Sequence, residues 1–233
     1  MPIGGRPILE YWLGFIKNLG SENVLINTHY RESDVNDFIK RECFNNWITI
    51  SYEQHLLGTA GTLIKNATFF KNSVILLIHG DNWVNADLIN FSNFHFNHRR
   101  KDCLISMMIF ETENPENSGI VEIDDEGVVI AFHEKQLNAP GKKANAAVYL
   151  LEPEVLNWLI LNPWILDFST EVIPNYIGKI ATWEHKGFFR DIGTPEMLKN
   201  AQKDPKPYLF FDNNDNWSLS FLNNPIHKKI ELI

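Results

Sequence analysis

The segment SVILLI, residues 73–78, constrains the fold more than any other part of the chain. Because it is apolar at every position after the serine, it predicts a central β-strand that is covered on both faces. Helical and strand-like patterns alternate around it: helices are expected at 7–19, 32–40, 59–70 and 87–99, and strands at 23–27, 47–52 and 103–110. This alternation predicts an α/β fold in which helices cover both faces of a Rossmann-like, mostly parallel mixed sheet, a three-layer α/β/α arrangement.

The second half of the chain has a different pattern. Residues 119–123 and 128–133 flank the turn sequence DDEG and predict a β-hairpin. Further strands are expected at 146–150, 180–184 and 187–190, and helices at 153–161, 168–177 and 196–202. From Asp204 onward the pattern fades into an Asn-rich segment. We therefore expect one domain at 1–203 and a tail of uncertain structure at 204–233.

Composition and charge argue against several classes of partner. The net charge is −8 and no run of Lys or Arg is present, so nucleic acid is not an expected partner. Cys43 and Cys103 lie far apart without metal-ligand spacing, which is typical of reduced thiols. No apolar run reaches the length of a membrane span, and residues 1–5 have no signal-peptide pattern. We therefore expect a cytoplasmic protein with no membrane partner.

Two acidic residues follow predicted strands. Asp81 comes directly after the central strand and Asp191 closes a late one. Ligands of open α/β sheets bind at the carboxyl ends of strands, and carboxylates from separate strands are a common way to hold Mg²⁺ against a phosphate. The alternative is that each Asp shapes a turn or caps a helix, which is the usual role of an isolated Asp at such a position.

Two further segments have the residue types of a binding site. Residues 57–61 (LGTAG) place glycines before a predicted helix, where the backbone can approach a ligand closely and the helix N-terminus offers free N–H groups. Glu134 and Lys135 follow the hairpin and could present an acceptor to a hydroxyl and a cation to a phosphate. The alternatives are an ordinary loop-to-helix turn and a solvated surface ion pair.

Taken in order, these segments resemble the sugar-1-phosphate nucleotidylyltransferases over nearly the whole chain to about residue 202. The resemblance rests on PIGGRPILEY at 2–11, LGTAG at 57–61, HGDN at 79–82, SG at 118–119, EK at 134–135, NAAVY at 145–149 and RDIGTP at 190–195. At position 147 an Ala replaces the usual Gly of the family. The nearest likeness is to bacterial mannose- and heptose-1-phosphate guanylyltransferases, which makes GTP the expected nucleoside triphosphate.

The resemblance implies a reaction and a role for each matched residue. A nucleoside triphosphate and a sugar 1-phosphate would give an NDP-sugar and pyrophosphate, on a fold of the nucleotide-diphospho-sugar transferase type. Homo-oligomer formation is left open. The implied catalytic residues are Asp81, Lys135 and Asp191, of which the two aspartates hold Mg²⁺. The implied nucleotide-binding residues are Gln54, Gly58, Thr59 and Gly61. The implied sugar-binding residues are Gly119, Glu134 and Asn145.

The sequence departs from the family pattern at its start. Members of the family begin with a strand, a Gly-rich loop that carries an Arg, and a Pro-Lys pair, and residue 1 of this sequence matches a position after these features. We therefore expect either an enzyme whose sequence here is truncated, or a degenerate member that binds sugar nucleotides without catalysis. A glycosyltransferase is a weaker alternative, against which the Glu-Lys pair and the closing DIGTP motif argue.

Overall fold

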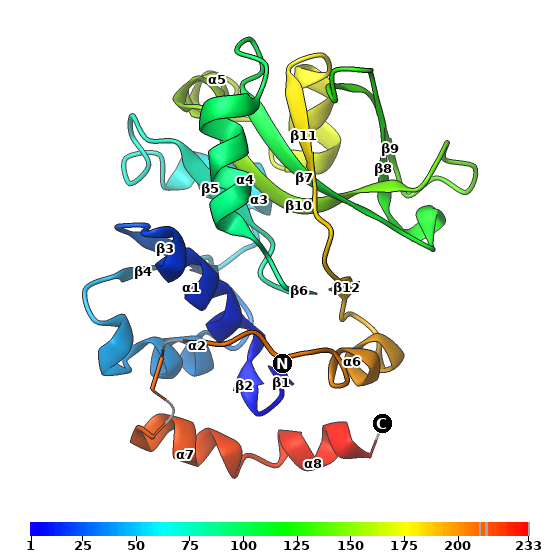
Figure 1. Ribbon diagram of the computed structural model, residues 1–233. Helices are drawn as coiled ribbons and strands as arrows, with labels where there is room; N and C mark the ends of the chain where they lie inside the picture. Colours follow the sequence, from blue (N-terminus) through cyan, green and yellow to red (C-terminus); the bar gives the residue numbers. More distant parts are fainter. Residues whose placement is uncertain (210, 213, 233) are drawn as a thin grey trace. The chain divides into compact units, whose positions relative to one another are not determined.

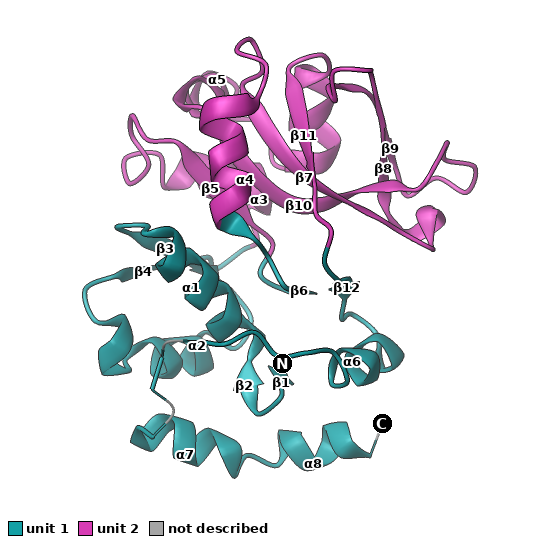
Figure 2. Cartoon of the chain, viewed as in Figure 1, with its two compact units in different colours: residues 1–55, 80–88, 187–233 teal, residues 56–79, 89–186 magenta. Residues whose placement is uncertain are grey.

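The computed structural model describes residues 1–209, 211–212 and 214–232 and shows a chain of helices and strands (Figure 1). The chain divides into two compact units, each assembled from separate segments (Figure 2). Unit 1 comprises residues 1–55, 80–88 and 187–233, and unit 2 comprises residues 56–79 and 89–186. The polypeptide therefore passes from one unit to the other four times, and residues far apart in sequence are brought into the same unit.

Unit 2 is built on a six-stranded mixed sheet in which β11, β7, β10, β8 and β9 follow one another and β5 lies beside β10. Among these described strands only β11 and β7 pair in parallel, whereas β10 runs antiparallel to β5, β7 and β8, and β8 runs antiparallel to β9. The strand bounds are β5 (Ile75–Ile78), β7 (Ile105–Glu111), β8 (Gly119–Ile123), β9 (Val129–Glu134), β10 (Lys143–Leu151) and β11 (Ile180–Glu184).

The predicted α/β fold, with a mixed sheet and helices, is confirmed, but antiparallel pairs outnumber parallel ones within this sheet. The reason lies in the connections, because parallel neighbours need a long crossover whereas antiparallel neighbours accept short loops. Between β7 and β10 the described chain contains only the β8–β9 hairpin, its loops and one 3₁₀ turn at Pro115–Asn117. The predicted hairpin is therefore present, and it sets the antiparallel character of this half.

Helices and an apolar cluster complete unit 2. The helices are α3 (Gly58–Lys65), α4 (Leu88–Asn93, whose first residue belongs to unit 1) and α5 (Pro153–Leu161). The helix predicted at 168–177 is instead a π-helical turn (Phe168–Val172) followed by a 3₁₀ turn (Ile173–Tyr176), and Pro174 lacks the N–H that a regular helix would use there. Residues from the sheet, α3, α5 and these turns form one buried cluster that includes Met107, Tyr149, Leu159 and Phe168.

Unit 1 contains small sheets and several helices. In the described part of the chain its strands form three two-stranded sheets: antiparallel β1 (Pro2–Ile3) with β2 (Arg6–Pro7), parallel β3 (Val24–Thr28) with β4 (Ile48–Tyr52), and antiparallel β6 (Asn82–Val84) with β12 (Phe189–Asp191). The helices are α1 (Ile8–Leu19), α2 (Glu32–Ile39), α6 (Pro195–Ala201), α7 (Asn216–Leu222) and α8 (Ile226–Glu231). As its sequence predicts, α1 ends at Gly20, whose φ of 84° is left-handed.

A buried arginine links the two ends of unit 1. The Arg41 side chain is only 1% exposed, and its guanidinium lies 2.9 Å from Glu10 Oε1 and 2.8 Å from Asp215 Oδ2. It also donates to the Asp212 carbonyl at 2.8 Å and packs against the rings of Phe38, Phe44 and Trp217. Asp212, Asp215 and Trp217 therefore pack against the part of unit 1 that carries α1 and α2. No helix among the described residues is long and apolar enough to cross a membrane.

Candidate functional site

The two predicted metal-binding aspartates, Asp81 and Asp191, meet in unit 1 at one end of a two-stranded ribbon. In the β6–β12 ribbon, Asp191 is paired with Asn82, so that Asp81 is one residue away along the neighbouring strand. Both aspartate side chains are exposed. Strand pairing thus places two aspartates that are far apart in sequence at the same end of the ribbon. A metal-binding role for the pair stays a prediction.

Buried side chains hold the ribbon in place. Trp83 of β6 is fully buried, and its indole N–H donates to Asp204 Oδ2 at 3.1 Å. Arg190 of β12 donates to the two oxygens of the same carboxylate at 2.6 and 2.9 Å. On α1, Trp12 donates to the Asn82 carbonyl at 3.0 Å. Asp204 therefore fixes both strands, and with them the positions of the two candidate metal ligands.

The donor set of the ribbon fits Mg²⁺. Neither Asp81 nor Asp191 forms an ion pair with another described residue, although Asp191 Oδ1 accepts a hydrogen bond of 2.8 Å from the Gly193 N–H. In the described ranges no three His, Cys, Asp or Glu side chains gather as a metal cluster. Two carboxylates without a third protein ligand suit Mg²⁺, which keeps several waters and takes its remaining ligands from substrate phosphates.

The predicted sugar-binding residues Gly119 and Glu134 lie opposite each other in unit 2, where they are paired at the open end of the β8–β9 hairpin. A Cβ at position 119 would lie 2.7 Å from Phe132 Cζ and 2.8 Å from Glu134 Oε2, so any larger residue would force the Phe132 and Glu134 side chains to move. Lys135 follows with an exposed side chain and a left-handed φ of 48°. The Lys135 N–H donates to the Ser118 carbonyl at 3.2 Å, which keeps Glu134 and Lys135 against the segment that carries Gly119.

Asn145, the third predicted sugar-binding residue, lies where β10 is irregular. The register against β7 shifts between Asn145 and Tyr149, and Ala147 has a left-handed φ of 53°. The Asn145 side chain stabilises this bulge, because its Oδ1 accepts from the Ala147 N–H at 3.0 Å and its Nδ2 donates to the Tyr149 hydroxyl at 2.6 Å. The φ at 147 gives a physical reason for the family's glycine at this position, since a side chain is disfavoured there.

Electrostatic contacts extend this group beyond the predicted residues. Burial raises the pKa of the Glu134 carboxyl; of the smaller effects, Lys135 and His79 lower this pKa and Asp167 raises it. Burial also raises the pKa of the Tyr149 hydroxyl, which shares hydrogen bonds with Asn145 and Ser169. The sequence did not predict a binding role for His79, Asp167 or Ser169; Ser169 was expected to cap the helix at 168–177, but Asp167 is the capping residue. The only sequence signal was the position of His79 beside the Gly-Asp motif, because no local pattern relates residues 167–169 to the hairpin.

The predicted nucleotide-binding residues are divided between the two units. Gln54 is exposed just after β4 in unit 1, whereas Gly58, Thr59 and Gly61 form the first turn of α3 in unit 2. Two of the N–H groups expected to be free, those of Ala60 and Gly61, donate to the Leu166 carbonyl at 2.8 and 3.3 Å.

The first turn of α3 packs closely against the segment around Leu166. Thr59 Oγ1 accepts from the Phe168 N–H at 2.7 Å, and a Cβ at Gly58 would lie 2.4 Å from the Leu166 carbonyl oxygen. This close backbone approach, together with a φ of 76°, explains the glycine at position 58. Binding of a nucleotide by Gln54, Gly58, Thr59 and Gly61 stays a prediction.

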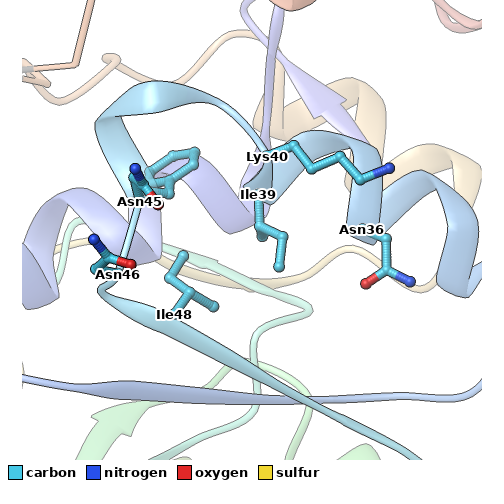
Figure 3. Close-up of a pocket in the computed structure, with 7 residues that line it drawn as sticks. Asn36, Ile39, Lys40, Asn45, Asn46 and Ile48 are labelled. Atoms are coloured by element: carbon cyan, nitrogen blue, oxygen red, sulfur yellow. The ribbon is translucent and has the colours of Figure 1, made fainter.

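An open pocket of about 470 Å³ lies elsewhere in unit 1, beside α2 and the start of β4 (Figure 3). Its lining combines apolar side chains with amides and one cation: Asn36, Ile39, Lys40, Phe44, Asn45, Asn46 and Ile48. The Lys40 ammonium lies 2.9 Å from Asp37 Oδ1. None of the predicted site residues lines this pocket, so it is separate from the candidate site.

Comparison with known proteins identifies related sequences along most of the chain. A family model described as nucleotidyl transferase matches residues 1–206. The mannose-1-phosphate guanylyltransferase of Mycobacterium tuberculosis is 28% identical over 209 residues, which are 88% of this chain and 57% of that protein. The D-glycero-alpha-D-manno-heptose 1-phosphate guanylyltransferase of Campylobacter jejuni is 28% identical over 84% of each chain. This chain spans about half the length of the mycobacterial relative and of the matching yeast guanyltransferases.

Solved structures share the fold. A protein of Bacillus anthracis described as a glucose-1-phosphate thymidylyltransferase, in complex with a sucrose, has a TM-score of 0.77 at 20% identity and covers 89% of this chain and 87% of its own. HddC of Yersinia pseudotuberculosis, complexed with GMP-PN, has a TM-score of 0.69 at 18% identity, with 87% of each chain covered. At such identities the likeness establishes the three-layer α/β/α fold of these proteins.

Proposed function

This chain belongs to the nucleotidyl transferase family, and we propose that it joins the nucleoside monophosphate of an NTP to a sugar 1-phosphate, giving an NDP-sugar and pyrophosphate. The observation that carries the proposal is the β6–β12 ribbon, in which strand pairing brings Asp81 beside the partner strand that ends in Asp191. Relatives with guanylyltransferase names make GTP the first nucleotide to test. The proposed location is the cytoplasm, where nucleoside triphosphates are made.

The reaction needs positioning and charge neutralisation more than covalent chemistry by the protein. An oxygen of the sugar phosphate attacks the α-phosphorus in line. As the new P–O bond forms, the bond to the β-phosphate oxygen breaks, and pyrophosphate leaves with the electron pair. Asp81 and Asp191 would hold Mg²⁺, whose charge offsets that of the phosphates.

The residues of unit 2 would bind the sugar 1-phosphate. Lys135 has an exposed ammonium that can pair with the sugar phosphate, and Glu134 presents carboxylate oxygens to sugar hydroxyls. Gly119 leaves space for the Glu134 side chain, as the close approach of a Cβ to Oε2 shows. Asn145 would bind a further hydroxyl through its amide, and Gln54, Gly58, Thr59 and Gly61 are proposed to contact the nucleotide.

The test is pyrophosphate release by the purified chain with Mg²⁺, each common NTP and a panel of sugar 1-phosphates. Asp81→Asn should lower kcat about a thousandfold, because it removes an oriented charge from a phosphoryl-transfer site. Asp125→Asn, in the exposed turn of the β8–β9 hairpin, is the matched control and should leave the rate unchanged. An Asp81→Asn protein as active as the parent would contradict the metal assignment.

A second outcome would replace the enzyme with a binding protein. Binding of an NDP-sugar without pyrophosphate release from any NTP would identify a non-catalytic sugar-nucleotide-binding protein. Absence of both binding and turnover over the whole panel would overturn the proposed function.

A further inference from the structure

His79 lies at the end of β5, close to the candidate sugar-binding residues of unit 2. Its backbone N–H donates to the Ala147 carbonyl at 3.1 Å, which ties it to the bulge of β10 beside Asn145. Its imidazole is close enough to Glu134 for an electrostatic interaction. The side chain therefore belongs to the same group of residues as Glu134 and Asn145, although its strand is distant from theirs in sequence.

The imidazole of His79 has an unused hydrogen-bonding atom. Nε2 is buried and has no hydrogen-bond partner among the described residues. A buried polar atom without a partner costs free energy, so native proteins normally pair such atoms with protein, water or ligand. His95 of the same unit also has a buried Nε2 that forms no hydrogen bond, but there Nδ1 lies 2.8 Å from Ser106 Oγ and Nε2 lies 3.3 Å from the Glu152 carboxylate.

The surroundings of His79 are those of a hydroxyl-binding site. Glu134 provides a carboxylate acceptor, and Asn145 and Tyr149 provide an amide and a hydroxyl already joined by a hydrogen bond. Sugar hydroxyls both donate and accept, so they can satisfy a carboxylate and an imidazole nitrogen at the same time. An apolar ligand group would leave Nε2 unpaired, which makes a hydroxylated ring the best chemical match.

We propose that His79 is a specificity-determining residue of the sugar subsite, where Nε2 forms a hydrogen bond with a hydroxyl of the sugar ring. The inference rests on the proposed function and adds to it a residue that discriminates between sugars. His79 is assigned no part in phosphoryl transfer. Its removal should therefore weaken sugar binding and leave the rate at saturating sugar 1-phosphate unchanged.

The test is calorimetric titration of the full chain with GDP-mannose, dTDP-glucose and UDP-glucose, each compared with its matching nucleoside diphosphate. For the NDP-sugar that the parent binds most tightly, His79→Leu should lose about tenfold in affinity, which is the typical effect of one hydrogen bond. Affinity for the NDP without sugar should stay the same. His98→Leu, at an exposed histidine of the π-helical turn Phe94–His98, is the matched control.

Two conservative variants separate a hydrogen bond from a packing role. The side-chain amide of Gln reaches the position of Nε2, whereas that of Asn reaches only that of Nδ1. His79→Gln should therefore retain most of the affinity, and His79→Asn should behave like His79→Leu. In turnover assays the loss should be a higher KM for the sugar 1-phosphate with kcat unchanged.

Failure of the role proposed for His79 can be distinguished from failure of the proposed function. Equal losses of NDP and NDP-sugar binding in His79→Leu, or equal behaviour of the Gln and Asn variants, would overturn the role of His79 and leave the proposed function standing. A parent chain that binds no NDP-sugar of the panel would overturn the role of His79, and if it also releases no pyrophosphate from any NTP, the proposed function falls as well.

Discussion

The two units of this chain differ in the interactions that stabilise the interior of each. Unit 2 has a six-stranded sheet and one large apolar cluster to which many residues contribute. Unit 1 has small sheets and a buried guanidinium, Arg41, which connects α1 with the segment that begins α7. Unit 1 also has an apolar cluster, which includes Leu13, Phe38 and Phe44, but it is smaller than that of unit 2 and the buried guanidinium lies beside it. We therefore expect stability to depend more strongly on a few buried polar contacts in unit 1 than in unit 2. Substitutions can test this difference directly.

The largest expected effect is that of Arg41→Leu on unit 1. Without the guanidinium, the buried Glu10 carboxylate keeps Arg6 at 3.0 Å but loses its fully buried partner, and breaking a buried ion pair costs up to about 3–5 kcal/mol. Hydrogen exchange should therefore show loss of protection in α1 and α7, with the sheet of unit 2 much less affected. Uniform loss of protection in both units would contradict the difference between them.

The matched control for Arg41 is an exposed arginine of unit 2. Arg100 pairs with Asp102 and Glu126, but its side chain is 36% exposed. Surface ion pairs contribute little to stability, so Arg100→Leu should leave exchange in both units close to that of the parent. A loss of exchange protection comparable to that of Arg41→Leu would show that the number of ion pairs, rather than their burial, decides the effect.

The next effect is that of a cavity in unit 2. Leu159 of α5 is fully buried in the apolar cluster, so Leu159→Ala should lower the unfolding free energy by about 3 kcal/mol. Leu159→Met conserves volume and should cost less than about 1.5 kcal/mol. Urea denaturation of both variants measures the difference. A Met variant as unstable as the Ala variant would show that unit 2 depends on an individual side chain, as we expect of unit 1.

The sequence predicted what local patterns determine. The Gly at position 20 indicated the end of α1, and the DDEG turn indicated the β8–β9 hairpin. The apolar run indicated the strand β5, but its predicted central position was wrong, because among the described strands β5 pairs with β10 alone. The sequence did not reveal the buried role of Arg41, because an arginine after a helix is normally exposed and its partners come from both ends of the chain. Local periodicity also does not encode strand direction, so the mostly antiparallel pairing within the six-stranded sheet was missed.

For the candidate site, the sequence identified residue types but not the contacts between them. Asp81 and Asp191 could be predicted because each follows a strand in a distinctive motif, and strand pairing supports their proximity. The left-handed φ at Ala147 and the unpartnered Nε2 of His79 could not be predicted, since both depend on the bulge in β10 and on its packing against β5.

Lowering the pH should reduce the stability of unit 2 selectively. Burial, followed by the nearby charges of Arg99 and Lys101, lowers the pKa of His95 to about 4, although Glu152 lies 3.3 Å from its Nε2. The unfolded chain, with a pKa near 6.5, then binds one more proton than the folded chain between these values. Stability contributed by neutral His95 is therefore present above pH 6.5 and declines as the pH falls toward 4. This should lower the unfolding free energy by about 2 kcal/mol from about pH 7 to about pH 5.

The variant His95→Gln isolates this effect. The Gln amide can still bond to Ser106 but cannot titrate. The unfolding free energy of the variant should therefore change less steeply with pH than that of the parent. Between about pH 5 and pH 6, the difference in slope should correspond to about one proton taken up on unfolding. The measurement is urea denaturation at several pH values, with hydrogen exchange to assign the change to unit 2. Parallel pH profiles for the parent and the variant would show that other groups cause the acid sensitivity.

The smallest effects concern backbone strain, which should not depend on how a unit is held together. Gly20 in unit 1 has a φ of 84°, and a Cβ there would meet no described atom beyond its chain neighbours within 4 Å. Gly20→Ala should therefore lower the unfolding free energy by about 1 kcal/mol through the backbone alone.

Ala147 in unit 2 has a φ of 53°, so Ala147→Gly relieves backbone strain but loses a half-buried methyl group. The net effect should be an increase of about 0.5 kcal/mol in the unfolding free energy. Thermal unfolding of the two variants measures whether each substitution raises or lowers the stability. If Ala147→Gly instead destabilises the protein, packing of the methyl group against the apolar cluster outweighs the strain. Unit 2 would then rely on individual apolar contacts more strongly than its distributed core predicts.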